Sequence, residues 1–311
     1  MKKFFYLFLC TAVLCSCNKV VSNVDEHGDT DGQNFEQLLM AVDELNASYG
    51  VAETKGAGGA VLTSFADVGG KALGSWLGSK LGAGLGVVTA NPVVGVVGYV
   101  AGRKFGGVAG AAAASYVAAH FLGGCIAVLP PFDPSNPDSQ TICLLDDPSY
   151  GETHNFLLNL LQQNGKTYIS SDGSISIEDV YDDLVALENE YGIEDPLSDN
   201  GTIRSIMISF CADVANAAQI SMQQNESAEI HMGRIENLLL DRGLSDQEVN
   251  VFVQLSERLI GCASLLEEEV ARQYEEDFED LVMESNLTDQ QKEETIQVGS
   301  VAIMSTIYWQ N

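Results

Sequence analysis

Glycine recurs at every fourth position over two stretches in the first half of the chain, and this spacing limits what the region can fold into. Four residues advance an α-helix by about 400°, so the glycines of one stretch share a helix face. An interior glycine costs a helix about 1 kcal/mol relative to alanine, and close packing against another backbone compensates for that cost. The pattern predicts a glycine-zipper hairpin over residues 66–122, turned at Thr89–Pro92. The predicted packing positions are Gly70, Gly74, Gly78, Gly82, Gly86, Gly98, Gly102, Gly106 and Gly110.

The N-terminus has the pattern of an export signal. Lys2 and Lys3 precede an apolar run from Phe4 to Leu14, which is typical of a secretory signal peptide over residues 1–16. The Leu14-Cys15-Ser16-Cys17 ending resembles a bacterial lipobox, which predicts a palmitate-bearing lipid anchor on Cys17. An ordinary signal peptide with incidental cysteines is the alternative.

The residues after the predicted anchor bear on its location. Asn18, in place of the aspartate associated with inner-membrane retention, favours the outer membrane or cell surface. Residues 17–33 are polar and acidic, and they are expected to form a flexible tether.

The charge of the chain is strongly divided. Between Lys55 and Phe132 five basic residues and one acid give a charge of +4. Because the whole chain carries −29, the remaining residues carry −33. Nucleic acid is a poor partner for such a chain, because phosphate contacts need clustered basic residues. The acidic residues outside the hairpin either serve the solubility of the protein or hold the basic hairpin in a soluble state. Candidates for membrane contact are Lys71, Trp76, Lys80, Arg103 and Lys104, with core packing or simple solvation as the competing account.

Residues 34–124 combine a leader helix (34–52) with this Gly/Ala-rich segment. Its two uncharged runs, 22 and 28 residues long, reach the roughly 20 residues that span a bilayer. Asn91-Pro92 divides the first run, however, and glycine and alanine are weakly apolar. The segment is therefore marginal for insertion and equally suited to burial inside a protein. A homo-oligomer through the hairpin is a further expectation.

A Pro-rich loop over residues 125–150 separates the two halves of the chain. Cys125 and Cys143 bracket it and are a possible disulfide, because an exported compartment permits one. Cys211 and Cys262 lie in apolar helical stretches, and two buried thiols or a second bridge are equally compatible with them.

Residues 151–311 are predicted to form an acidic helical bundle, so that the whole fold is all-α. Ser245 with Glu248 has the spacing of a capping box, as has Thr288 with Gln291, and Ser176 with Asp179 resembles one. The expected helices are Asn155–Leu161, Val180–Tyr191, Ile203–Met222, Ala228–Leu240, Val249–Met283 and one that follows Thr288. The only strand signal is residues 167–177.

The sequence offers little catalytic chemistry. It has no Ser-His-Asp elbow, P-loop or HExxH pattern, and residues 168–179 match a calcium loop poorly. His154 is expected to make local hydrogen bonds at a helix start, and Trp309 to pack in the core. We therefore predict no catalytic residue, metal site or cofactor.

The first half of the chain resembles a known group of proteins. A lipobox signal, a short helical leader, Asp67-Val68-Gly69-Gly70, a glycine-zipper hairpin and His154-Asn155 are similar to the bacteriocin-like glycine-zipper lipoproteins of the Bacteroidota. The resemblance implies a surface or outer-membrane protein that can be membrane-active, and it supplies no catalytic residues.

Three classes of function are compatible with the sequence. The first is a cell-envelope lipoprotein with a structural hairpin. The second is a toxin-like protein whose hairpin inserts into a target bilayer. The third is a helical ligand-binding protein or an enzyme with a site that these motifs do not reveal.

Overall fold

The computed structural model describes residues 28–50, 61–74, 108–122, 148–193 and 201–310. This part of the chain is all-α and contains no strand, as predicted. Besides a helix over residues 61–74, which we call the central helix, it contains nine helices. They are α2 (Gly28–Ser48), α5 (Val108–Leu122), α6 (Tyr150–Gln163), α7 (Ile177–Glu190), α8 (Gly201–Gln224), α9 (Ala228–Asp241), α10 (Asp246–Ala263), α11 (Glu268–Glu284) and α12 (Asp289–Gln310).

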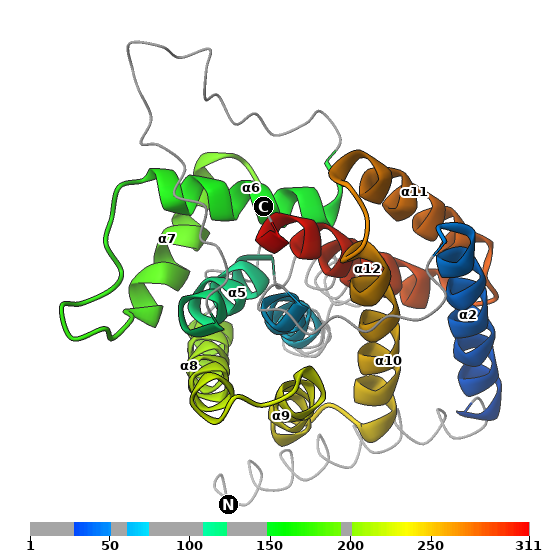
Figure 1. The fold of residues 1–311 in the computed structure, drawn as a ribbon, viewed down its shortest axis with the longest axis horizontal. Coiled ribbons are helices and arrows are strands. Elements are labelled where there is room, and N and C mark those ends of the chain that lie inside the picture. The colour runs from blue at the N-terminus through cyan, green and yellow to red at the C-terminus, as the bar shows by residue number, and fades with distance from the viewer. Residues whose placement is uncertain (1–27, 51–60, 75–107, 123–147, 194–200, 311) are drawn as a thin grey trace, which may run out of the picture.

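The helices surround the glycine-rich segment. In Figure 1 the central helix is seen nearly end-on in the middle, beside α5, while α6 to α10 and α12 lie around the pair. α5 packs on α6, α7 and α8, whereas α12 packs on α6, α10 and α11. α2 is outermost and contacts α10 and α11. The glycine-rich helices therefore form the interior and the acidic helices the shell.

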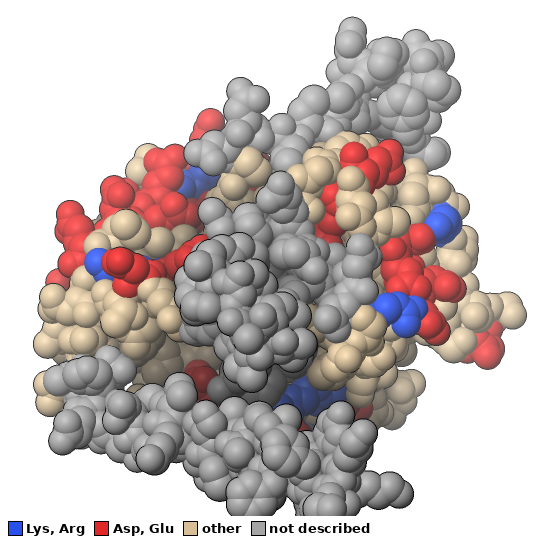
Figure 2. Space-filling model, turned by 180° about the vertical axis from the view of Figure 1, so that it is seen from behind, with Lys and Arg blue, Asp and Glu red and all other residues tan. Residues whose placement is uncertain are grey.

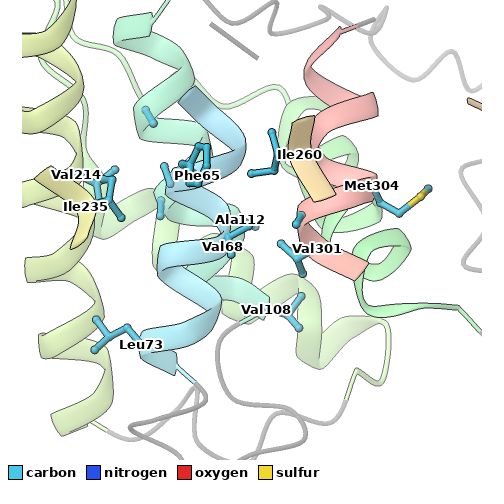
Figure 3. Packing of buried hydrophobic residues seen from close by; sticks show 14 of the residues in the cluster. Phe65, Val68, Leu73, Val108, Ala112, Val214, Ile235, Ile260, Val301 and Met304 are labelled. Carbon is cyan, nitrogen blue, oxygen red and sulfur yellow. The ribbon is translucent and has the colours of Figure 1, made fainter. Parts of the chain in front are cut away.

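One continuous hydrophobic core joins these elements. Figure 3 shows Phe65, Val68 and Leu73 of the central helix among side chains of α5, α8, α9, α10 and α12. The opposite, solvent side of the shell carries many Asp and Glu side chains and few Lys and Arg, as the described surface in Figure 2 shows. The acidic composition is thus accommodated outside a core of small and aliphatic residues.

Helix ends in the second half follow their local signals. Ser245 accepts from Glu248 N, and the Glu248 side chain accepts from Ser245 N, so the predicted capping box is present. Thr288 and Gln291 exchange the equivalent pair of bonds at the start of α12. Ser176 instead bonds the Asp179 side chain and gives no side-chain cap to the backbone.

Several features differ from the sequence prediction. α6 begins at Tyr150, before the predicted Asn155 and inside the predicted loop, because Ser149 and Glu152 form a capping box there. α2 begins at Gly28, inside the predicted tether, and ends at Ser48, before the predicted end of the leader helix at residue 52. The predicted helix Val249–Met283 is two helices, since the chain turns after Ala263 and restarts at Glu268. The strand signal forms one isolated bridge, Ile169 to Ile175.

Candidate functional site

The central helix is enclosed on almost every side and carries buried polar and charged side chains. Twelve of its 14 residues are buried, the exceptions being Leu62 and Ala72. A side chain on Gly69 would meet Ile235 of α9 and Phe210 of α8. Contacts described below add α5 of the interior and α6 and α12 of the shell.

The two predicted glycine stripes meet within the described residues at one point. A Cβ atom on Gly70 would lie 2.7 Å from the Gly110 carbonyl oxygen and 2.8 Å from Ala111 Cα. Real Cβ atoms do not approach backbone this closely, so only glycine fits at residue 70. The predicted positions from Gly78 to Gly106, and the turn between them, lie outside the described residues, and no neighbouring atoms are described for Gly74.

Asp67 is the acidic residue of the central helix, and its carboxylate is fully buried. Its Oδ2 accepts hydrogen bonds from Ser305 Oγ and, at 3.1 Å, from Trp309 Nε1, both on α12. Its Oδ1 lies 3.2 Å from His154 Nε2 on α6, with both side chains 0% exposed. This distance is that of an ion pair, although the angle falls short of a well-directed hydrogen bond.

The neighbour of His154 fixes one of its protons. Asn155 Nδ2 donates to the Met304 carbonyl at 3.0 Å, so Asn155 Oδ1 is left to accept from His154 Nδ1 at 2.9 Å. Nδ1 therefore carries a hydrogen, and Nε2 faces Asp67 Oδ1. A water-free core tolerates such a pair best when one further proton, on Nε2 or on Oδ1, makes the pair neutral overall.

Burial raises the pKa of Asp67, while His154, Ser305 and Trp309 act in the opposite direction. The rise means that ionisation of Asp67 is less favourable inside the bundle than in water. We call Asp67, His154, Asn155, Ser305 and Trp309 the core lock, because they join the central helix to α6 and α12.

Lys71, one helical turn beyond Asp67, is also fully buried. Its Nζ lies 5.2 Å from the centre of the Tyr150 ring of α6, a cation–π distance. Lys71 is therefore buried in the described structure, and its role as a membrane contact stays a prediction. Trp76, Lys80, Arg103 and Lys104 lie outside the described residues.

α5 is held by a buried acid of the shell. Glu188 of α7 is 1% exposed, and its Oε1 accepts from Ala109 N at 3.1 Å. A carboxylate at the first turn of a helix is favoured by the helix dipole and satisfies an otherwise unpaired N–H. Thirteen of the 15 residues of α5 are buried.

A second buried histidine joins α8 to α9. Ser221 Oγ donates to Glu226, which also pairs with Arg234, and it accepts from His231 Nδ1 at 2.9 Å. Burial lowers the pKa of His231 to about 4, so this imidazole is neutral at pH 7. These contacts satisfy polar groups where α8 connects to α9, and they involve residues other than those of the core lock.

The two described cysteines are free thiols. Cys211 and Cys262 are both buried and unbridged, and burial raises the pKa of the Cys211 thiol to about 12. Of the two alternatives from the sequence, two buried thiols is therefore correct. Cys17, Cys125 and Cys143 lie outside the described residues, and with them the anchor and the predicted disulfide.

Both ring nitrogens of His154 are directed at other members of the core lock. Nδ1 contacts Asn155, and Nε2 faces Asp67. Within the described ranges no three His, Cys, Asp or Glu side chains are grouped to hold a metal ion. In residues 168–179, Asp172 accepts from Ser174 N and Oγ and so closes its own turn.

Comparisons with known proteins add no assignment. No family model, curated protein or solved structure matches this chain. A search of the described helices also found none with the length and apolarity that a membrane span requires.

Sequence reasoning noted Asp67 and His154 separately and missed their pairing. One signal was present: a single acid in a basic and apolar segment needs a partner if that segment is buried. The roles of Glu188 and Ser305 had no comparable signal, because acids and serines are common throughout the shell.

Proposed function

We propose that the protein is a lipid-anchored cell-envelope component, at the outer membrane or cell surface, in which the glycine-rich helices form the structural core. The observation that carries this proposal is the core lock. Asp67 and Lys71 would both be costly in a bilayer, whereas inside the bundle each lies beside specific groups of α6 or α12. The anchor is supported by the lipobox-like sequence at Cys17.

Fractionation of cells that express the Cys17→Ser variant tests the anchor. We expect the wild-type chain in the membrane fraction and the variant in the soluble periplasmic or culture fraction. Membrane association of Cys17→Ser equal to that of the wild type would move the attachment to the glycine-rich segment and contradict the tether.

A second candidate function is a bacteriocin-like protein whose hairpin enters a target bilayer. It is favoured by one specific arrangement: α5 is apolar around almost its whole circumference, and an acidic amphipathic shell covers it. A soluble carrier of a membrane-active hairpin needs such a cover. In this candidate the core lock is what must break before insertion.

Dye release from liposomes separates the two candidates when the lock is broken deliberately. His154→Ala removes the partner of Asp67, and His231→Ala is its matched control, because it removes an equally buried imidazole that has no part in the lock. If the hairpin is structural, both variants lose stability and neither releases dye. Release by His154→Ala alone would favour the membrane-active candidate and overturn the structural one.

The third class, a ligand-binding protein, has one described feature in its favour. An open groove of about 500 Å³ runs between α2 and α11, with Leu38, Leu45 and Leu281 beside Asp277, Asp280 and Glu284.

A further inference from the structure

Glu275 of α11 is a buried carboxyl group that the core lock does not use. It is 5% exposed, and its Oε1 accepts a hydrogen bond from Ser300 Oγ of α12. The same Ser300 oxygen accepts from Gly151 N at 2.7 Å, at the start of α6. Three helices therefore meet at this carboxyl group.

The groups that face Glu275 are hydroxyls and acids. Ser149 and Glu152 of α6 and Glu279 of α11 surround it together with Ser300. Arg272, three residues before Glu275 on α11, is engaged by Glu152 and by Glu268, the latter at 3.2 Å. On the α2 side of α11, Tyr49 donates to Asp277, while Asp43 of α2 pairs with Arg258 of α10. A negative charge on Glu275 would thus be buried beside two other acids.

We propose that Glu275 is a proton-controlled contact which holds α11 against α6 and α12 when it is protonated and loosens α11 when it is ionised. A protonated carboxyl group can donate to a hydroxyl or carbonyl oxygen as well as accept from Ser300. An ionised one must keep a buried charge whose described hydrogen-bond donors are neutral hydroxyls.

The electrostatics agree with this geometry. Burial raises the pKa of Glu275 to about 7 from an ordinary value of 4.5; Ser300 and Ser149 oppose the rise, and Glu279 and Glu152 add to it. Because the closed state binds the proton more tightly than the open state, its extra stability is complete below about pH 4.5. That stability is lost as the pH rises through about 7.

Hydrogen exchange of α11 in the full-length protein, compared with Glu275→Gln at each pH, tests the proposal. The amide keeps an acceptor for Ser300 and cannot ionise, and comparison at equal pH cancels the intrinsic exchange rate. Hydrogen exchange gives the equilibrium constant for local opening of α11. We expect this constant for the wild type, divided by that for Glu275→Gln, to rise about tenfold between pH 6 and pH 8. Glu276→Gln, which removes an exposed charge from the neighbouring position, is the control and should open as the wild type does.

A ratio that stays constant from pH 6 to pH 8 would overturn the proposal. Carbon NMR of the glutamate carboxyl groups gives an independent check that does not depend on stability. One carboxyl resonance, missing from Glu275→Gln, should titrate near pH 7. If every glutamate carboxyl titrates below pH 6, Glu275 is not the controlling group.

Discussion

The shell helices and the glycine-rich helices differ in where their polar side chains lie and in how those side chains are paired. In the shell, most charged side chains face water, and helix ends are closed by neighbours three residues away, such as Ser245 with Glu248. In the central helix, Asp67 and Lys71 point into the protein and contact residues more than 75 positions later in the sequence, His154 and Tyr150. Local bonds therefore define the shell helices, whereas the interior is held by contacts between elements remote in the chain.

The comparison also shows where small residues matter. Glycines at the helix ends of the shell, such as Gly192 and Gly243, have positive φ and end helices. Gly70 lies in mid-helix and admits the backbone of α5. Glycine thus allows a positive φ at helix ends of the shell, whereas in the interior it allows two helices to approach closely.

The largest expected effect comes from breaking the core lock. Asp67→Ala and His154→Ala should each lower the free energy of unfolding by about 3–5 kcal/mol, because each leaves a buried partner unpaired. The double variant should lose less than the sum, since the pair is removed together. Urea denaturation at pH 7 measures all three. Asp67→Asn, which keeps an acceptor for Ser305 and Trp309, should lose less than Asp67→Ala; full stability of Asp67→Ala would show that the lock holds nothing.

Overpacking the interior should have the next largest effect. Gly70→Leu places a side chain on the Gly110 and Ala111 backbone and should cost about 1–3 kcal/mol or more, because the backbone cannot move aside as a side chain can. The melting temperature should fall. Gly233→Ala in α9 is the control, with no atom within 4 Å of the added methyl group, and should be neutral or stabilising by up to about 1 kcal/mol. Equal melting temperatures for the two variants would contradict close packing at Gly70.

A smaller effect is expected in the shell. Ser245→Ala removes the side-chain cap of α10 and should cost about 1 kcal/mol in denaturant unfolding. Ser176→Ala is matched to it, since Ser176 precedes α7 without capping its backbone, and it should cost less. A reversed order would show that helix-end bonds do not explain the stability of the shell.

The sequence allowed the shell to be predicted in considerable detail. Capping boxes at Ser245 and Thr288 are present, and the glycines that follow α7 and α9 end those helices. One exception is the break between α10 and α11, where Ser264–Glu267 contain neither glycine nor proline. The turn at this break lets α11 pack on α12 and α2. Because that packing involves residues remote in the chain, the residues of the turn themselves do not indicate it.

For the interior, the sequence by itself determined composition and period: a helical segment of small and apolar residues with one acid, Asp67, between its first basic positions. Whether such a segment meets lipid or protein does not follow from its composition, because both surroundings are apolar. The tertiary structure decided that residues 61–74 and 108–122 lie inside the shell, and that Lys71 is covered. It also decided the partner of Asp67, because the free energy of a buried charge depends on which groups the fold brings within hydrogen-bonding distance, and that proximity is a property of the folded chain.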